Sequence, residues 1–447
     1  MRSISDIVRQ FKLQWTQQLN AEAIVTACRD AQMVWLDSTL NPVVTIQIFF
    51  LQILHGNTAC DHLPHLARLS FTAAAYCRAR MRIKLEALRL LLKRSVESLQ
   101  QDVFDRSRWL GHRLFFVDGS SFSMPDTPQL QAHFGQSGGQ RPGCGFPTAH
   151  WLAMMHAGTG MITEMLASPL RTHDMSKTMQ LHPALQAGDL LVADRGFCSF
   201  VHLALLWQRG VHGLIRIHQR TIVDFTPARA HVHPSKGKAD YKKGMPRSVW
   251  IKQLGVTDQI VQWLKPTDKP VWISARQYAA LPAGIVVREL RYSIHEKGFR
   301  PKEITLVTTL IDSQRYPLSQ LADLFRQRWQ IETNFGHLKT TMKMDVLKCK
   351  TVDGVLRELQ VFALIYNLVR QVMLEAAYSQ RVDLQRISFI DALRWLQTAQ
   401  PGDALPRLVV NPYRPNRLEP RVRKRRPKQY PLMTKPRRLL KKELEST

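Results

Sequence analysis

The sequence lacks several features that mark common classes of protein. Its 6 cysteines in 447 residues form no CxxC pair, which argues against a zinc ribbon or a disulfide framework and indicates a reducing, cytoplasmic setting. No GxxxxGK(S/T) loop is present, so nucleotide hydrolysis is not supported. The N-terminus has no apolar signal region, and the most apolar stretch, residues 42–54, is shorter than the roughly 20 residues of a membrane-spanning helix. We expect neither a signal peptide nor a membrane span.

Acidic residues are scarce beside basic ones. The chain has 35 Asp and Glu against 63 Lys and Arg, a formal net charge of +28 and a pI of about 10.3, so a large polyanion is the expected partner. With 45% hydrophobic and 8% aromatic residues, the chain is not a disordered basic protein, and its length favours two or three domains. Nucleic acid is therefore the leading candidate for the partner.

The first hundred residues carry helical patterns. Apolar residues recur at helical spacing over residues 81–99, which predicts an amphipathic helix. Basic residues dominate residues 66–94. This basic run is typical of a helical module that reads DNA and equally of a solvated helix face, and the spacing does not choose between them.

Short apolar runs beyond residue 113 predict strands, and the pattern of elements predicts a mixed α/β fold. A helix is expected at 176–186, a second β-rich block follows at about 221–309, and helical patterns return from 318 to about 397. The strand candidates are residues 114–117, 151–156, 161–166, 190–193, 212–217, 248–251, 271–274, 285–292 and 304–310.

The C-terminal 37 residues are strongly basic. Residues 411–447 hold 13 Lys and Arg against 3 Glu, and 6 prolines lie between 412 and 436. Prolines at this density exclude a continuous helix and favour an extended tail. Clustered cations suit a clamp on the DNA backbone, and a solubilising disordered tail is the alternative.

Three carboxylates are placed where phosphodiester chemistry needs them. Asp118 and Asp194 each end a predicted strand, and Glu332 lies in a predicted helix. Two hard divalent cations require carboxylate oxygens that converge from different elements. Each acid also has a simpler reading: a hairpin turn at Asp118, a strand-to-loop turn at Asp194, and a surface ion pair between Glu332 and Arg328.

The helix around Glu332 is the more specific signal. Phe325, Arg328, Glu332 and Lys339 fall at i, i+3, i+7 and i+14, which is one face of a helix. In this arrangement Glu332 would bind a metal ion, while Arg328 and Lys339 grip phosphate oxygens. Gly336 on the same face would leave room for a DNA backbone, or would only mark a kink.

Four segments, taken in order, resemble the DDE transposases of bacterial insertion sequences. They are FFVDGSSFSMPDTP, GDLLVADRGF, ITLVTTL and FRQRWQIETNFGHLK. The last is similar to the Tyr-x2-Arg-x3-Glu-x6-Lys signature of the IS4 family, with Phe325 in place of the tyrosine. The resemblance covers residues 113–377.

This resemblance implies a ribonuclease-H-like catalytic core in which Asp118, Asp194 and Glu332 hold two Mg²⁺ ions, with Mn²⁺ as a possible substitute. Arg328, Lys339 and Phe325 correspond to the DNA-phosphate-binding positions, and Phe325 keeps the ring without the hydroxyl. Members of this family also stack a flipped base on an aromatic ring of the insertion domain. Trp250, Trp263 and Trp272 are available, the sequence does not choose among them, and packing in the core is the favoured interpretation of each. The implied domains are a helical, DNA-end-binding domain (1–105), the first part of the core (106–220), a β-rich insertion domain (221–310), the helical second part of the core (311–400) and a basic, proline-rich tail (401–447).

The expected function is that of a DNA transposase. It would cut the inverted-repeat ends of its insertion sequence and transfer them into target DNA, by a route that includes a DNA hairpin in this family. Double-stranded DNA is the partner, the enzyme is expected to act as a homodimer on the ends, and its place is the cytoplasm at the nucleoid. Two alternatives are a decayed or repurposed transposase that only binds DNA, and a basic RNA-packaging or ribosome-associated protein.

Overall fold

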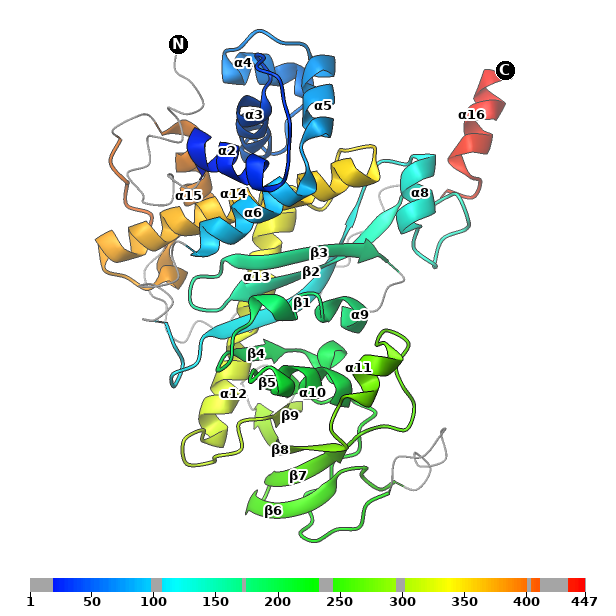
Figure 1. Ribbon diagram of the computed structural model, residues 1–447, viewed down its shortest axis with the longest axis vertical. Helices are drawn as coiled ribbons and strands as arrows, with labels where there is room; N and C mark the ends of the chain where they lie inside the picture. The colour runs from blue at the N-terminus through cyan, green and yellow to red at the C-terminus, as the bar shows by residue number, and fades with distance from the viewer. Residues whose placement is uncertain are drawn as a thin grey trace.

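The computed structural model describes residues 19–97, 107–170, 174–232, 244–294, 302–399, 403–410 and 433–446. In this part of the chain a nine-stranded sheet has the order β3-β2-β1-β4-β5-β9-β8-β7-β6, and Figure 1 shows it running along the length of the molecule. The prediction of a mixed α/β fold is confirmed. The strands are β1 (Leu114–Ser123), β2 (Thr148–His156), β3 (Ile162–Pro169), β4 (Leu190–Ala193), β5 (His212–Arg216), β6 (Val249–Gly255), β7 (Asp258–Leu264), β8 (Gly284–Ile294) and β9 (Lys302–Thr308).

The centre of the sheet is parallel and its two flanks are antiparallel. β1 pairs with β4 and β4 pairs with β5 in parallel, and every residue of β4 is buried. A short continuous apolar run of this kind is typical of a strand covered on both faces. Strands β6 to β9 come from the β-rich block at 221–310, and they continue the same sheet through the antiparallel pairing of β5 with β9.

Helices cover both faces of the sheet, and the sheet separates two large apolar cores. Because side chains alternate along a strand, Phe116 and Val192 face the first core, and Phe115 and Val117 face the second. The first core is covered by α6 (Leu85–Glu97), α12 (Leu318–Gln327), α13 (Trp329–Gly336), α14 (Val352–Gln380) and α15 (Phe389–Thr398); the second is covered by α10 (Phe200–Gln208) and α11 (Ala275–Ala279).

The N-terminal helices pack around α14, as Figure 1 shows at the end of the sheet that β3 forms. The apolar run 42–54 is the helix α3 (Pro42–Leu54), which starts with Pro42 at its first turn and is capped by the Asn41 side chain. Of the described helices, none is both long and apolar enough to cross a membrane. The other helices of this region are α2 (Ala21–Asp30), α4 (Leu63–Ala67) and α5 (Ala73–Arg82).

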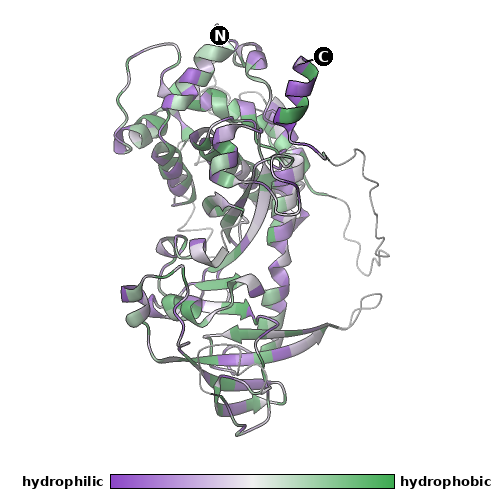
Figure 2. Cartoon of the chain, turned by 90° about the vertical axis from the view of Figure 1, so that its right-hand side faces the viewer, coloured by the Kyte–Doolittle hydropathy of each residue, from purple (hydrophilic) through white to green (hydrophobic). Residues whose placement is uncertain are grey.

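The amphipathic helix predicted at 81–99 begins later than expected. Met81 belongs to α5 and is exposed, whereas α6 starts at Leu85 and buries Leu88, Leu91, Leu92 and Val96. Figure 2 shows how hydrophobic and hydrophilic stretches alternate along the helices, as expected where one side of a helix faces the interior.

Two other expected elements differ in the structure. Residues 271–274 form no strand, and Val271 is almost fully exposed, because the turn that follows Pro270 leads directly into α11. The helix expected at 176–186 is reduced to α9 (Asp174–Thr178) and a 3-10 turn, His182–Ala184. Pro183 lacks the N–H that a continuous helix would need at that point.

A buried ion pair joins the starts of β1 and β4. Arg113 donates from Nε and Nη2 to the two carboxylate oxygens of Asp189, both at 2.7 Å, and both side chains are buried. The backbone N–H of Leu190 donates to the carbonyl of Arg113 at 2.9 Å. Arg113 and Asp189 directly precede the paired segments of β1 and β4.

Candidate active site

Asp118 and Asp194 are neighbours on the two central strands. The parallel register runs from Leu114 with Leu190 to Val117 with Ala193, so these aspartates are the next residues of each strand. Adjacent strands lie about 4.8 Å apart. The prediction that Asp118 ends its strand is wrong, because β1 continues beside β2 to Ser123; only its pairing with β4 ends there. Asp194 follows β4 as predicted.

Both aspartates face the helices that carry Glu332. Asp118 lies two residues after Phe116 and Asp194 two residues after Val192, and these two apolar residues belong to the first core. Side chains two residues apart on a strand share a face. The carboxylates therefore lie on the side of the sheet that α12, α13 and α14 cover.

The single helical face predicted for residues 325–339 is divided between three segments. α12 ends at Gln327, α13 starts at Trp329, and a π-helical turn, His337–Thr341, follows. α13 is fixed over the sheet by Phe335, whose ring centroid lies 4.4 Å from that of Trp151 on β2. π-Helical turns are rare and frequently occur at functional sites.

Arg328, at the junction of α12 and α13, connects two of the acids. Its Nη1 donates to Oδ2 of Asp118 at 3.0 Å and its Nη2 donates to Oε1 of Glu332 at 3.2 Å. The Arg328 side chain is only 5% exposed, whereas that of Glu332 is 43% exposed. One buried guanidinium thus holds the strand carboxylate and the helix carboxylate toward each other.

The surroundings of Asp118 raise the pKa of its carboxyl above the ordinary value. Burial raises the pKa of the Asp118 carboxyl, while the backbone N–H of Gly119 and the Arg328 guanidinium lower it. The negative charges of Glu332 and Asp194 raise it further. The Asp118 carboxylate therefore lies within electrostatic range of the other two acids, and a cation beside it would favour its ionised form.

One carboxylate oxygen of Asp194 has no hydrogen-bond donor among the described residues. Its Oδ1 is buried and accepts no hydrogen bond from the described residues; Nη1 of Arg216 lies 3.8 Å away, beyond hydrogen-bond distance. Burying a carboxylate oxygen without a donor is costly. This orphaned oxygen is an observation that favours a metal ligand.

The donor set suits a hard divalent cation, although the side chains are not gathered into a ready site. Three carboxylates are the oxygen ligands that Mg²⁺ and Mn²⁺ prefer. Within the described ranges, no group of three or more His, Cys, Asp or Glu side chains is close enough to hold a metal ion. Oxygens of Asp118 and Glu332 accept hydrogen bonds from Arg328, which would have to yield those oxygens to a cation.

Lys339 contacts β1 through Ser120, a residue that the sequence patterns did not single out. Its Nζ donates to Oγ of Ser120 at 3.0 Å. Ser120 lies two residues after Asp118 on β1, and therefore on the same face. The available signal was this i, i+2 spacing of Asp and Ser within a strand.

Phe325 has a structural position beside Arg328. Its side chain is buried in the first core, and the Arg328 guanidinium carbon lies 5.7 Å from its ring centroid. The Trp329 ring lies at 5.6 Å from the same carbon. These aromatic rings favour the cation through their π-faces and restrict the orientation of Arg328.

Two of the three tryptophans that were candidates for stacking on a flipped base pack against the second core. Trp263 and Trp272 pack against the second core, and the indole N–H of Trp263 donates to Oε1 of Glu289 at 2.8 Å. Trp250 lies on β6, and its indole nitrogen is buried without a hydrogen-bond partner in the part of the chain that is described.

The sequence of the chain is similar to transposases. The profile of the transposase DDE domain family matches residues 109–368. The transposase InsG for insertion sequence element IS4 of Escherichia coli (strain K12) is 26% identical over 381 residues, which cover 81% of this chain and 78% of that protein. The putative transposase InsZ of the same organism is 22% identical over 138 residues, covering 31% of this chain and 46% of that protein. A piggyBac transposase, solved as a synaptic complex with hairpin DNA, superposes with a TM-score of 0.37 at 12% identity, covering 89% of this chain and 80% of that one.

Proposed function

The chain belongs to the DDE transposases, and on that basis we propose that it cuts DNA at the inverted-repeat ends of an IS4-type insertion sequence and joins those ends to target DNA. The observation that supports the proposal is that Asp118 and Asp194 come directly after the paired residues of β1 and β4, while Arg328 donates hydrogen bonds to both Asp118 and Glu332. The catalytic domain that performs these reactions would have a ribonuclease-H-like fold.

The carboxylates and the two basic residues have separate tasks in this proposal. Asp118 and Asp194 would offer oxygens from the sheet, and Glu332 would offer oxygens from α13 on the opposite side. Two Mg²⁺ ions, or Mn²⁺ in their place, would when bound lower the pKa of an attacking water and stabilise the leaving oxygen of the scissile phosphate. Arg328 and Lys339 would hold non-bridging phosphate oxygens and orient the DNA backbone.

The same residues would serve the later steps. After the first cut, the free 3′-hydroxyl would take the position of the water and attack the phosphorus of a second phosphodiester, whose own 3′-oxygen would leave as a new 3′-hydroxyl. This exchange requires no covalent bond to the protein. A hairpin on the excised end would be one such attack. Two protomers acting together would bring both ends into reach, at the nucleoid where the DNA substrate lies.

The deciding experiment is cleavage of a labelled duplex that carries the ends of the element. Wild-type protein should nick the duplex in Mg²⁺ and not in EDTA, and Asp194→Ala should bind the ends without nicking them. Binding of the ends by both proteins with no cleavage in Mg²⁺ or Mn²⁺ would instead support the alternative, a repurposed transposase that only binds DNA. Circular dichroism spectra would establish that both are folded.

Ser120 should matter for cleavage through Lys339. Ser120→Ala removes the oxygen that accepts from Lys339 Nζ, and the loss of one such hydrogen bond, about 1 kcal/mol, corresponds to a fall of about fivefold in the single-turnover cleavage rate. Ser120→Thr keeps the hydroxyl in a strand position that suits a β-branched residue, so it should restore most of the rate.

Ser121→Ala is the matched control, because Ser121 lies on the opposite face of β1 and its removal should leave the rate unchanged. A double variant with Lys339→Met should be no slower than Lys339→Met alone, since the serine acts only through the lysine. Additive losses, or equal losses for Ser120→Ala and Ser121→Ala, would contradict this role.

A further inference from the structure

The C-terminal helix α16 (Arg437–Glu445) is attached to the core at its first residue. Nη1 of Arg437 lies 3.1 Å from Oδ2 of Asp126 and donates to the carbonyl of Gly145 at 3.3 Å. Its guanidinium carbon lies 3.8 Å from the centroid of the Phe146 ring, well inside the range of a cation–π interaction. An ion pair, a backbone acceptor and an aromatic face therefore meet on one arginine.

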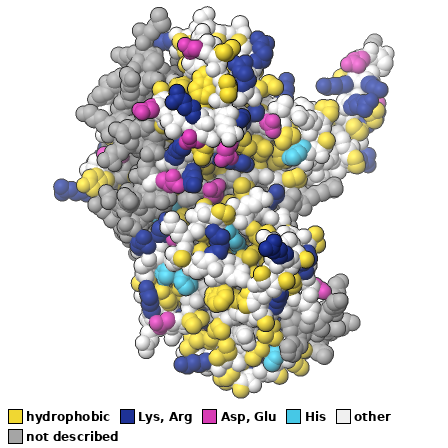
Figure 3. Space-filling view, viewed as in Figure 1, with side chains coloured by type: hydrophobic (Ala, Val, Ile, Leu, Met, Phe, Trp, Pro, Cys, Tyr) yellow, Lys and Arg dark blue, Asp and Glu magenta, His cyan; other side chains and the backbone are white. Residues whose placement is uncertain are grey.

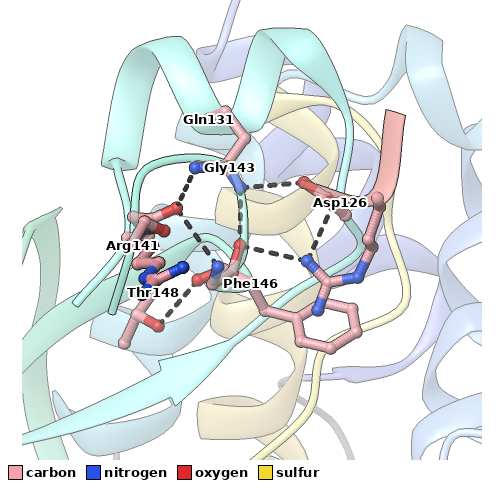
Figure 4. Close-up of polar contacts among 9 residues, drawn as sticks. Asp126, Gln131, Arg141, Gly143, Phe146 and Thr148 are labelled. Carbon is pink, nitrogen blue, oxygen red and sulfur yellow. Dashed lines mark hydrogen bonds and ion pairs between the residues drawn. The ribbon is translucent and has the colours of Figure 1, made fainter. Parts of the chain in front are cut away.

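The surface that receives α16 also has hydrogen bonds of its own, which do not involve the helix. Gln131, on α8 (Pro128–Phe134), donates to Oδ1 of Asp126 and to the carbonyl of Gly145, both at 2.8 Å. Figure 4 shows Asp126, Gln131 and Phe146 grouped in this network. Gly143 has a positive φ of 77°, and a Cβ there would lie 2.9 Å from Cβ of Pro436, so a glycine is needed where the chain docks.

Beyond this anchor α16 stands clear of the core. None of its residues is buried, and Figure 1 shows it projecting beside α8. Residues 433–446 hold 5 basic and 2 acidic side chains. Arg438, Lys441 and Lys442 are spaced at i, i+3 and i+4, which places them along one side of the helix, and Figure 3 shows Lys and Arg side chains gathered there.

The anchor lies on the continuation of the catalytic strand. Ser123, the last residue of β1, is bridged to Val346, and Asp126 follows three residues later. The five residue steps from Asp118 to Ser123 span about 17 Å at the rise of a β-strand, which is the length of about five base pairs of duplex DNA. A duplex that leaves the carboxylates along β1 would therefore run toward the Asp126 side of the core, where α16 is attached.

We propose that α16 is an arm that binds the phosphate backbone of duplex DNA next to the cleavage position, with Arg438, Lys441 and Lys442 as the contacting residues. The inference rests on the proposed function for the identity of the duplex. Charge favours DNA over a second copy of this strongly basic chain. The three leucines of the helix, Leu439, Leu440 and Leu444, offer far less than the roughly 800 Å² per partner of a stable protein interface.

The test compares full-length wild type with the triple variant Arg438→Gln, Lys441→Gln, Lys442→Gln. The Kd for a labelled duplex with the element ends is measured over a range of salt concentrations. Three lost phosphate contacts should reduce the slope of log Kd against log salt by about 2 to 3. Cleavage at saturating DNA should remain at the wild-type rate, because none of the three residues contacts the carboxylates. An unchanged Kd and slope would overturn the proposal.

A second variant separates the two kinds of partner. Leu440→Gln with Leu444→Gln keeps every cation of the arm, so DNA binding should be unchanged. Loss of self-association in this variant, together with normal DNA binding by the triple variant, would assign the helix to a protein contact and overturn the proposal. A salt slope that falls in the triple variant, together with no cleavage by the wild-type protein, would refute the proposed function while leaving the arm supported.

Discussion

Replacing Glu332 by glutamine should lower the rate of metal-dependent strand cleavage by about a thousandfold or more, since Glu332 is a carboxylate ligand in the proposed two-metal site and such a ligand contributes several kcal/mol to the transition state. Glutamine has the same length and can still accept the hydrogen bond that Arg328 Nη2 gives at 3.2 Å. The Glu332 side chain is partly exposed, so Tm should change by no more than about 2 °C. Single-turnover cleavage of a labelled duplex measures the rate.

Glu375→Gln is the control for this variant, because Glu375 is an exposed glutamate on α14 and its replacement removes the same charge at another place. It should cleave at the wild-type rate. Affinity of Glu332→Gln for the duplex should equal or exceed that of wild type, since a negative charge beside phosphates has been removed. A Glu332→Gln protein that cleaves within tenfold of wild type would refute its role as a ligand.

Asp258→Asn should destabilise the protein by about 3–5 kcal/mol, which is the usual cost of breaking a buried ion pair by removing one partner. Arg288 is only 1% exposed, donates from Nε to Oδ1 of Asp258 at 2.7 Å, and donates from Nη1 to the carbonyl of Tyr316 at 2.6 Å. With asparagine, the guanidinium stays buried without its counter-charge. The free energy of unfolding in urea, followed by tryptophan fluorescence, measures the loss.

The double variant Asp258→Leu, Arg288→Met removes both charges and should be less destabilised than Asp258→Asn, because no unpaired charge remains. Equal or greater destabilisation of the double variant would show that packing, rather than the lost counter-charge, dominates at this position. Tyr316 lies just before α12, so both variants should also loosen the start of the helical segment that leads to Arg328.

The sequence was sufficient to predict the types of secondary structure that carry the candidate site. The apolar run 190–193 followed by Asp194 predicted a buried strand with an acid at its end, and the structure has β4 there. The spacing of Phe325, Arg328, Glu332 and Lys339 predicted helical structure there, which the structure has, although not as one continuous α-helix. Both predictions depend on local patterns, because burial fixes the periodicity of short segments.

What the sequence could not supply depends on pairing between distant segments. Nothing in residues 114–123 shows that β1 has β2 along its whole length but β4 along only its first part, so the strand was expected to end at Asp118. The break at Arg328 and the π-helical turn around Lys339 are also invisible, since the residues are compatible with one regular helix. Ser120 became a candidate only when Lys339 was placed beside it.

The buried ion pair between Arg113 and Asp189 helps to fix the register of β1 against β4. Each residue lies five positions before an aspartate of the site, Arg113 before Asp118 and Asp189 before Asp194. A slip of one residue between β1 and β4 would turn one aspartate to the opposite face of the sheet. The same slip would also separate two buried charges that now share two hydrogen bonds of 2.7 Å. A misaligned pairing of β1 with β4 would therefore be destabilised at the starts of these strands, away from the carboxylates. The ion pair favours the one register in which Asp118 and Asp194 lie on the same face of the sheet.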